Sequence, residues 1–144
     1  IRIGAHIPEG YIDNLSQRID IYKKIASIQN EEDAMDVTDE LIDRFGEPPQ
    51  AVQGLIDVAL LRNIAASLGI YEISQKNDMI VFYPSVFDFE RASRVSAALR
   101  SRVSIGAGAK PYIAVRVAEK EEPIHTMRAA LYLMSGPQKE GKAK

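Results

Sequence analysis

Residues 55–84, LIDVALLRNIAASLGIYEISQKNDMIVFYP, contain the point at which the spacing of apolar residues changes. Up to Leu68 the apolar residues recur at the three- and four-residue steps of an α-helix. Beyond Gly69 they form two short runs, residues 70–75 and 79–83, which are separated by a polar turn. The stretch therefore predicts a helix that ends at the glycine and leads into a β-hairpin.

Two amphipathic helices are predicted before this stretch. The first runs from about Asp13 to Gln29, and the second begins after the predicted N-cap Asn30 and ends at Gly46. A short edge strand over residues 1–7 is predicted to precede them. The predicted buried positions are Leu15, Ile19, Tyr22 and Ala26 in the first helix, widened by Ile12, Ile25 and Ile28, and Ala34, Val37, Leu41 and Phe45 in the second.

A helix, a strand and a final helix are predicted after the hairpin. The first helix follows Pro84, the strand covers residues 112–118, and the last helix begins at Pro123. Residues 137–144 are expected to form a disordered tail. The pattern predicts a mixed α/β class, with a helical N-terminal half followed by a small sheet covered by helices, in one domain over residues 1–136. The predicted buried stripe of the helix after the hairpin is Phe89, Ala92, Val95, Leu99 and Val103.

The composition excludes several classes of protein. An apolar fraction of 46% with 26% charged residues is near the average of globular chains, so wholesale disorder is not expected. The absence of cysteine excludes disulfides, thiolate zinc sites and cysteine nucleophiles. No uncharged stretch reaches the ~18 residues of a membrane helix, so no membrane partner is expected. The start at Ile1 without Met or a leader predicts a piece of a longer polypeptide.

No motif predicts a catalytic, cofactor-binding or metal-binding residue. The segment from Gly136 to Ala143 resembles the start of a phosphate-binding loop, but Ala143 replaces the hydroxyl residue that holds magnesium. His6 and His125 are far apart and lack neighbours at metal-ligand spacing. We therefore expect no enzyme, no cofactor and no ATP hydrolysis by this chain alone.

Charge is distributed unevenly along the chain. Residues 1–70 carry a net charge of −6 and residues 71–144 a net charge of +4, within a total of −2. On the second predicted helix, carboxylates and one arginine occupy the side opposite the apolar stripe. This side is either a solvated polar face with a Glu40–Arg44 pair or a surface that docks a protein. Its residues are Asp36, Asp39, Glu40, Asp43, Arg44 and Glu47.

Three segments in the first half together resemble a known family. They are IPEGYI at residues 7–12, IYKKIA at residues 21–26 after Arg18, and DELIDRFG at residues 39–46, followed by Pro49. In this order and spacing, they resemble the C-terminal domain of the bacterial transcription-repair coupling factor. The resemblance covers residues 1 to about 70, and beyond them only the order of elements fits.

The resemblance implies a regulatory role in a large, cytoplasmic, multidomain DNA translocase. Such a protein displaces stalled RNA polymerase and recruits the excision-repair protein UvrA, and its ATPase motifs reside in other domains. Its C-terminal domain packs on a UvrB-like N-terminal region of the same polypeptide and masks the UvrA-binding surface. Glu40, Asp43 and Arg44 are the residues that we expect at the centre of this inhibitory contact.

The alternative is a nucleic-acid-binding domain that uses the basic second half. No exposed aromatic residue is predicted to interleave with its cations, and the acidic half would repel phosphate. Little direct binding of nucleic acid is therefore expected. The cations of this alternative are Arg91, Arg94, Arg100, Arg102 and Lys110.

Overall fold

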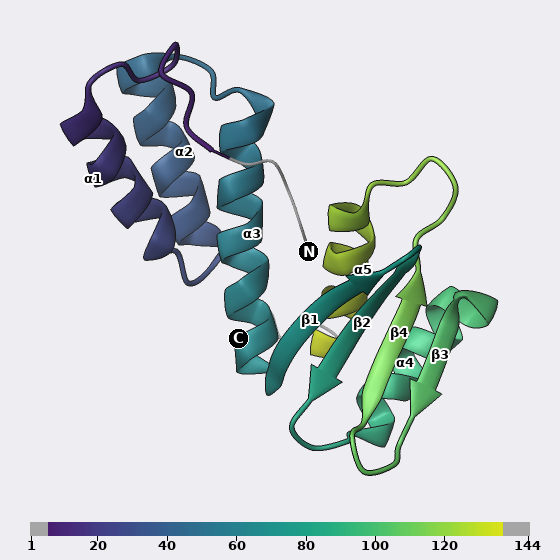
Figure 1. Cartoon of the computed structure of the whole chain (residues 1–144). Helices are drawn as coiled ribbons and strands as arrows, with labels where there is room; N and C mark the ends of the chain where they lie inside the picture. Colours follow the sequence, from purple (N-terminus) through teal and green to yellow (C-terminus); the bar gives the residue numbers. More distant parts are fainter. Residues whose placement is uncertain (1–5, 137–144) are drawn as a thin grey trace. The chain divides into compact units, whose positions relative to one another are not determined.

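The computed structural model describes residues 6–136, which form five α-helices and a four-stranded antiparallel sheet (Figure 1). This mixed α+β architecture confirms the predicted fold class. The chain divides into two compact units, a helical unit that ends at Ile64 and a sheet unit that begins at Ala65, and the boundary lies within helix α3 (Gln50–Ser67). That residues 1–136 act as a single domain stays a prediction.

The predictions for the two ends of the chain fall mainly outside the described residues. The edge strand was placed over residues 1–7, of which residues 1–5 are not described; His6 and Ile7, which are described, do not lie in a strand. The predicted tail over residues 137–144, with most of the loop-like glycine-lysine segment, also lies outside the described residues.

Local capping explains where the first two helices begin and end. Helix α1 (Leu15–Ala26) starts at Asn14, whose side-chain oxygen accepts a hydrogen bond from the Gln17 amide at 2.9 Å. Helix α2 (Glu31–Phe45) starts at Asn30, which accepts in the same way from the Asp33 amide at 2.8 Å. Gly46 ends α2 with a φ of 89°, a left-handed value that suits glycine.

The core of the helical unit confirms the predicted face of α2 but only part of the predicted face of α1. Leu15, Ile19 and Tyr22 are 62%, 47% and 39% exposed, and Ala26 is exposed as well. The buried residues of α1 are Ile25, which the prediction included as widening the stripe, and Ile21, which it did not include. Ile12 and Ile28, which were predicted in the same way as Ile25, are also buried. The centre of the predicted stripe was wrong because α1 has two apolar arcs, about 110° apart at 100° per residue, and packing selects the isoleucine arc. The buried core residues are Ile7, Ile12, Ile21, Ile25, Ile28, Ala34, Val37, Leu41, Val52, Ile56 and Leu60.

The end of α2 is closed by two aromatic residues. Leu41 is fully buried, as predicted, whereas Phe45 is only half-buried because it lies in the last turn. The Phe45 ring packs at a tilt on Tyr11, with ring centroids 5.9 Å apart. The Tyr11 hydroxyl donates to the Gly46 carbonyl at 2.7 Å, so it ties the N-terminal segment to the end of the helix.

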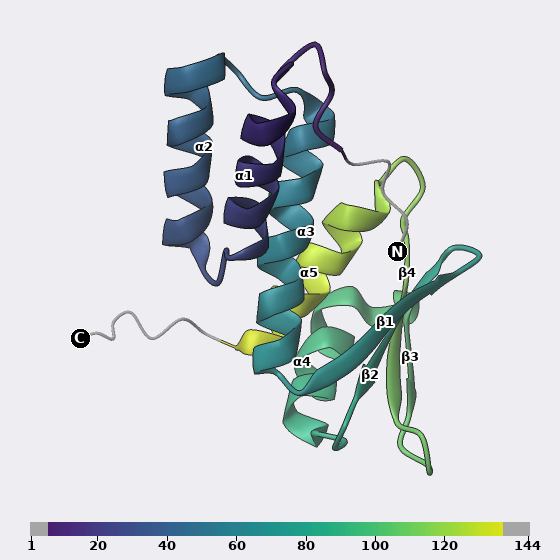
Figure 2. The same ribbon diagram turned by 60° about the vertical axis from the view of Figure 1, so that its left-hand side comes forward.

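The sheet unit begins with the predicted hairpin of β1 (Ile70–Lys76) and β2 (Met79–Pro84). Strands β3 (Val103–Gly106) and β4 (Tyr112–Arg116) complete a sheet of order β1-β2-β4-β3. Helices α4 (Phe89–Leu99) and α5 (Pro123–Ser135) lie on the same face of this sheet, as Figure 2 shows. Alternating residues of the strands therefore reach the core beneath the helices, chiefly Ile80, Phe82, Ile113 and Val115.

Two predictions about α4 were wrong. Phe89 is 76% exposed because it is the first residue of the helix, directly after the N-cap Asp88. Val103 does not continue the helix; it starts β3 and pairs with Val115. This strand is only four residues long. It forms because it pairs with β4, and no local sequence pattern predicts it.

Candidate partner-binding surface on helix α2

The outward side of α2 is acidic along its whole length. Glu31, Glu32 and Asp33 lie in the first turn, where the helix dipole favours negative charge. Asp39 and Asp43 lie nearer the C-terminus, where the same dipole disfavours them, and both are exposed. Helix stability explains the first group of carboxylates but not the second.

Glu40 is held between two cations from different helices. Lys24 of α1 donates to both carboxylate oxygens, at 2.9 Å and 2.7 Å, and Arg44 donates to one of them at 2.7 Å. The hydrogen bond from Lys24, followed by that from Arg44, lowers the pKa of Glu40 from its usual value. The side chain is 30% exposed, so the carboxylate is ordered and ionised but still open to solvent.

Asp43 and Arg44 differ in the contacts that their side chains make within the described residues. Within residues 6–136, the exposed carboxylate of Asp43 has no hydrogen-bonding or ion-pairing partner. The Arg44 guanidinium binds Glu40 and also lies over the Phe45 ring, 4.8 Å from its centroid. The structure therefore brings Glu40 and Arg44 together, and it shows no partner for Asp43 among residues 6–136.

The three residues do not all lie opposite the apolar face of α2. Glu40 lies on the flank that faces α1, and Arg44 leans over Phe45, so only Asp43 has the fully outward position that the helical spacing predicts. Sequence reasoning also missed Lys24. Lys24 and Glu40 are 16 residues apart and lie in different helices, and no local pattern in the sequence predicts such a pair.

The arginines of the nucleic-acid alternative are used inside the sheet unit. Arg91 donates to the Leu68 carbonyl at 2.7 Å, and Arg94 donates to the carbonyls of Leu133 and Met134 at 2.9 Å and 2.6 Å. These carbonyls lie at helix ends, where the regular hydrogen bonds of the helix run out. The Leu133 carbonyl also accepts from the amide of the C-cap Gly136 at 3.2 Å. Arg94 therefore satisfies the end of α5.

Two further cations of that alternative also have internal contacts. Arg102 binds the Arg116 carbonyl at 2.9 Å and the Glu121 carboxylate at 2.8 Å. Lys110 lies over the Tyr83 ring, 4.5 Å from its centroid. Arg100 is exposed and has a φ of 52°. The five cations therefore do not form one free basic cluster.

Glu121 joins the last strand to the last helix. Its carboxylate accepts from the Thr126 hydroxyl at 2.7 Å and the Ala118 amide at 3.2 Å, besides the contact with Arg102. The Thr126 hydrogen bond is the main reason that the pKa of Glu121 is lowered. Since every group here serves the fold, we interpret this cluster as structural.

The part of the chain that the structure describes shows neither a metal-binding cluster nor a membrane-spanning helix. No three His, Asp or Glu side chains between residues 6 and 136 come together as metal ligands. Among the described helices, none has the length and apolar character needed to span a membrane.

The fold and this surface define a small α+β domain whose most distinctive feature is an acidic helix with an ordered ion-pair network. The sequence profile of the TRCF domain family matches residues 1–93, and the chain belongs to this family. The family resemblance predicted from the three sequence segments is thereby confirmed.

Curated relatives carry the name transcription-repair-coupling factor. Those of Staphylococcus haemolyticus (strain JCSC1435) and Bacillus subtilis (strain 168) are 35% and 36% identical over 80 residues, which is 56% of this chain. That of Escherichia coli (strain K12) is 36% identical over 84 residues, or 57% of this chain. The match spans about 7% of the length of each relative.

The fold is that of a solved domain. The crystal structure of the C-terminal domain of transcription-repair coupling factor superposes with a TM-score of 0.83 at 22% identity, covering 94% of this chain and 87% of that chain. The likeness includes the sheet unit, although the family profile ends at residue 93.

Proposed function

We propose that this chain is a non-catalytic regulatory domain of a transcription-repair coupling factor. It packs on the UvrB-like region of its own polypeptide and masks the surface that binds UvrA. The observation that carries the proposal is the acidic side of α2, where the unpaired Asp43 lies next to the ordered group of Lys24, Glu40 and Arg44. Membership in the TRCF domain family supports the proposal that the parent protein is a transcription-repair coupling factor.

The arrangement suits a partner that presents arginines. A UvrA-binding surface on the UvrB-like region would carry guanidinium groups, and carboxylates bind these groups with strong, charge-assisted hydrogen bonds. Glu40 is already fixed by two cations, so it loses little side-chain freedom on docking. Asp43 offers the full charge of an unpaired carboxylate. Truncating one side of such a contact can cost roughly 2–5 kcal/mol, because the opposite charge is left unpaired.

The domain's role in transcription-coupled repair would follow from the activity of its parent protein. In the resting state the domain would keep UvrA away from its binding surface on the UvrB-like region. Engagement of stalled RNA polymerase would release the domain from that surface. The contacts with UvrA and RNA polymerase would then be made by other regions of the parent in the bacterial cytoplasm. The domain itself would hydrolyse no ATP.

The test uses the parent protein and purified UvrA. Wild type, the double variant Glu40→Ala with Asp43→Ala, and a deletion of residues 1–144 are titrated with UvrA. The matched control replaces two exposed carboxylates of the sheet unit, Glu72→Ala with Glu119→Ala, which removes the same charge elsewhere. We expect tighter UvrA binding by the double variant and the deletion, and wild-type binding by the control.

Each outcome has a definite meaning for the proposal. Equal UvrA affinity in wild type, double variant and deletion would contradict masking. Tighter binding by the deletion alone would keep the function and reject Glu40 and Asp43 as its centre.

A further inference from the structure

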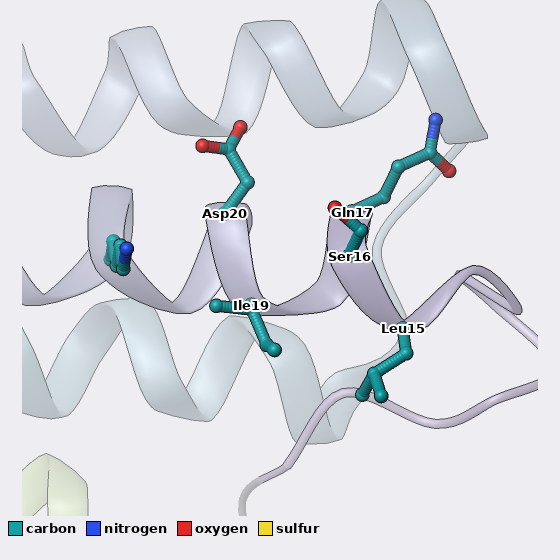
Figure 3. Close-up of a pocket in the computed structure, with 6 residues that line it drawn as sticks. Leu15, Ser16, Gln17, Ile19 and Asp20 are labelled. Carbon is teal, nitrogen blue, oxygen red and sulfur yellow. The ribbon is translucent and has the colours of Figure 1, made fainter.

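Helix α1 has a second apolar face that the core does not use. Leu15, Ile19 and Tyr22 follow one another at steps of four and three residues and are 62%, 47% and 39% exposed. Figure 3 shows Leu15 and Ile19 on one side of the helix, away from Asp20 and Gln17. The core of the helical unit is built from the other arc, through Ile21 and Ile25. We call the three exposed residues the α1 stripe.

The stripe is an ordered surface rather than a set of scattered apolar residues. Single exposed apolar side chains are common, but a contiguous patch marks an interaction site. Tyr22 at one end of the stripe is fixed, because its hydroxyl accepts a hydrogen bond from the Ile7 amide at 2.9 Å. A partner therefore meets a preformed face, which lowers the entropy cost of binding.

The α1 stripe is continuous with the acidic surface of α2. A shallow hollow on α1 is lined by Leu15 and Ile19 together with Asp20 and Lys23 (Figure 3). A second hollow, between α1 and α2, shares Asp20 and Lys23 and reaches Glu40. The two hollows therefore connect Leu15 and Ile19 of the stripe with Glu40 around the outer side of α1, through the Asp20 and Lys23 that they share.

We propose that the α1 stripe is the apolar half of the docking surface and that it binds an apolar patch beside the arginines of the same partner region. This inference rests on the proposed function. The occupant follows from charge and continuity. The acidic side of α2 is complementary to a cationic partner, and a partner that covers it and the outer side of α1 meets Leu15 and Ile19. Protein interfaces commonly combine an apolar core with a polar rim in this way.

The stripe would make the masking insensitive to salt. Exposed charge pairs are screened over about 8 Å at physiological ionic strength and over about 3 Å at 1 M. A contact made by carboxylates alone would therefore open as salt is added. Apolar burial does not depend on charge, so the stripe would hold the domain in place when the α2 contacts are screened.

The experiment compares variants of the parent protein by UvrA titration at low and high salt. The test variant is Leu15→Ser with Ile19→Ser, and the control is Val86→Ser, which changes a 77% exposed apolar residue of the sheet unit. We expect the test variant to bind UvrA about tenfold more tightly than wild type, a factor equal to about 1.4 kcal/mol, and we expect the ratio of the two affinities to be larger at high salt. The control should bind like wild type at both salt concentrations.

The outcomes separate this inference from the proposed function. Wild-type UvrA affinity of the stripe variant at both salts, with tighter binding by the deletion of residues 1–144, would overturn the stripe and keep the masking. Unchanged affinity of the deletion would overturn both. If thermal melting shows that the serine variant is unfolded, Leu15→Ala with Ile19→Ala replaces it, because alanine favours the helix and still removes the apolar contact.

Discussion

The two units of this chain use their charged side chains in opposite ways. In the helical unit, the carboxylates of α2 face outward, and Asp43 has no partner among the described residues. In the sheet unit, Arg91, Arg94 and Arg102 turn back onto main-chain carbonyls. The acidic half therefore leaves charge exposed on its surface, whereas several cations of the basic half make contacts within the fold. Net charge alone does not reveal this difference.

The largest effect expected from a single substitution is in the core of the helical unit. Leu41→Ala should lower the free energy of unfolding by about 2–5 kcal/mol, because the side chain is fully buried. Leu15→Ala, the same change on the exposed stripe, should alter it by no more than about 0.5 kcal/mol. Urea denaturation of both variants measures the two changes in the free energy of unfolding. Similar losses for the two leucines would mean that the face of α1 is wrongly placed.

A smaller effect tests the contrast between the units directly. Arg94→Ala removes the side-chain donor to the Met134 carbonyl and one of the two donors to the Leu133 carbonyl, which also accepts from the Gly136 amide at 3.2 Å, so it should cost about 1–3 kcal/mol. Asp43→Ala removes a charge that supports no described contact and should change stability by less than about 0.5 kcal/mol. Thermal melting of both variants is the measurement. A larger loss for Asp43 than for Arg94 would reverse the contrast.

Acid should reveal the ordered carboxylate on α2. The pKa of Glu40 is lowered from 4.5 in the folded chain, so its contribution to stability is full above about pH 4.5 and is lost as the pH falls through the folded pKa. The contribution is modest because the pair is partly exposed. Glu40→Gln should therefore flatten the fall in melting temperature below pH 4.5, relative to wild type. Parallel melting curves for the two proteins would show that the network with Lys24 contributes nothing.

The smallest expected signal is binding of nucleic acid. Four of the five cations named for this role have internal contacts, and the acidic unit repels phosphate. Fluorescence anisotropy with single-stranded and duplex DNA should show no binding tighter than about 1 μM at physiological salt, which is weaker than typical specific affinities. Tighter binding with a steep salt dependence would reopen the alternative and weaken the contrast between the units.

Local signals predicted most of the elements. The change of apolar period at Gly69 predicted the end of α3 and the β1–β2 hairpin, and Asn30 and Gly46 predicted the limits of α2. These signals are local because caps and turns depend on neighbouring backbone angles. Strand β3 was missed because a four-residue strand is established by its partner. Phe89 was misplaced because the apolar stripe was extended into a helix end.

The sequence by itself determined the order of the five helices and of strands β1, β2 and β4, the family, and the acidic side of α2. Each of these depends on residue types at fixed spacing along the chain. Only the tertiary structure decided which apolar arc of α1 is buried, which cations cap carbonyls, and that Lys24 binds Glu40. Periodicity shows that a helix has an apolar arc, but burial depends on what packs against it. Where α1 has two such arcs, the choice between them came from the packing of the whole unit, and the arc left over is the surface proposed for a partner.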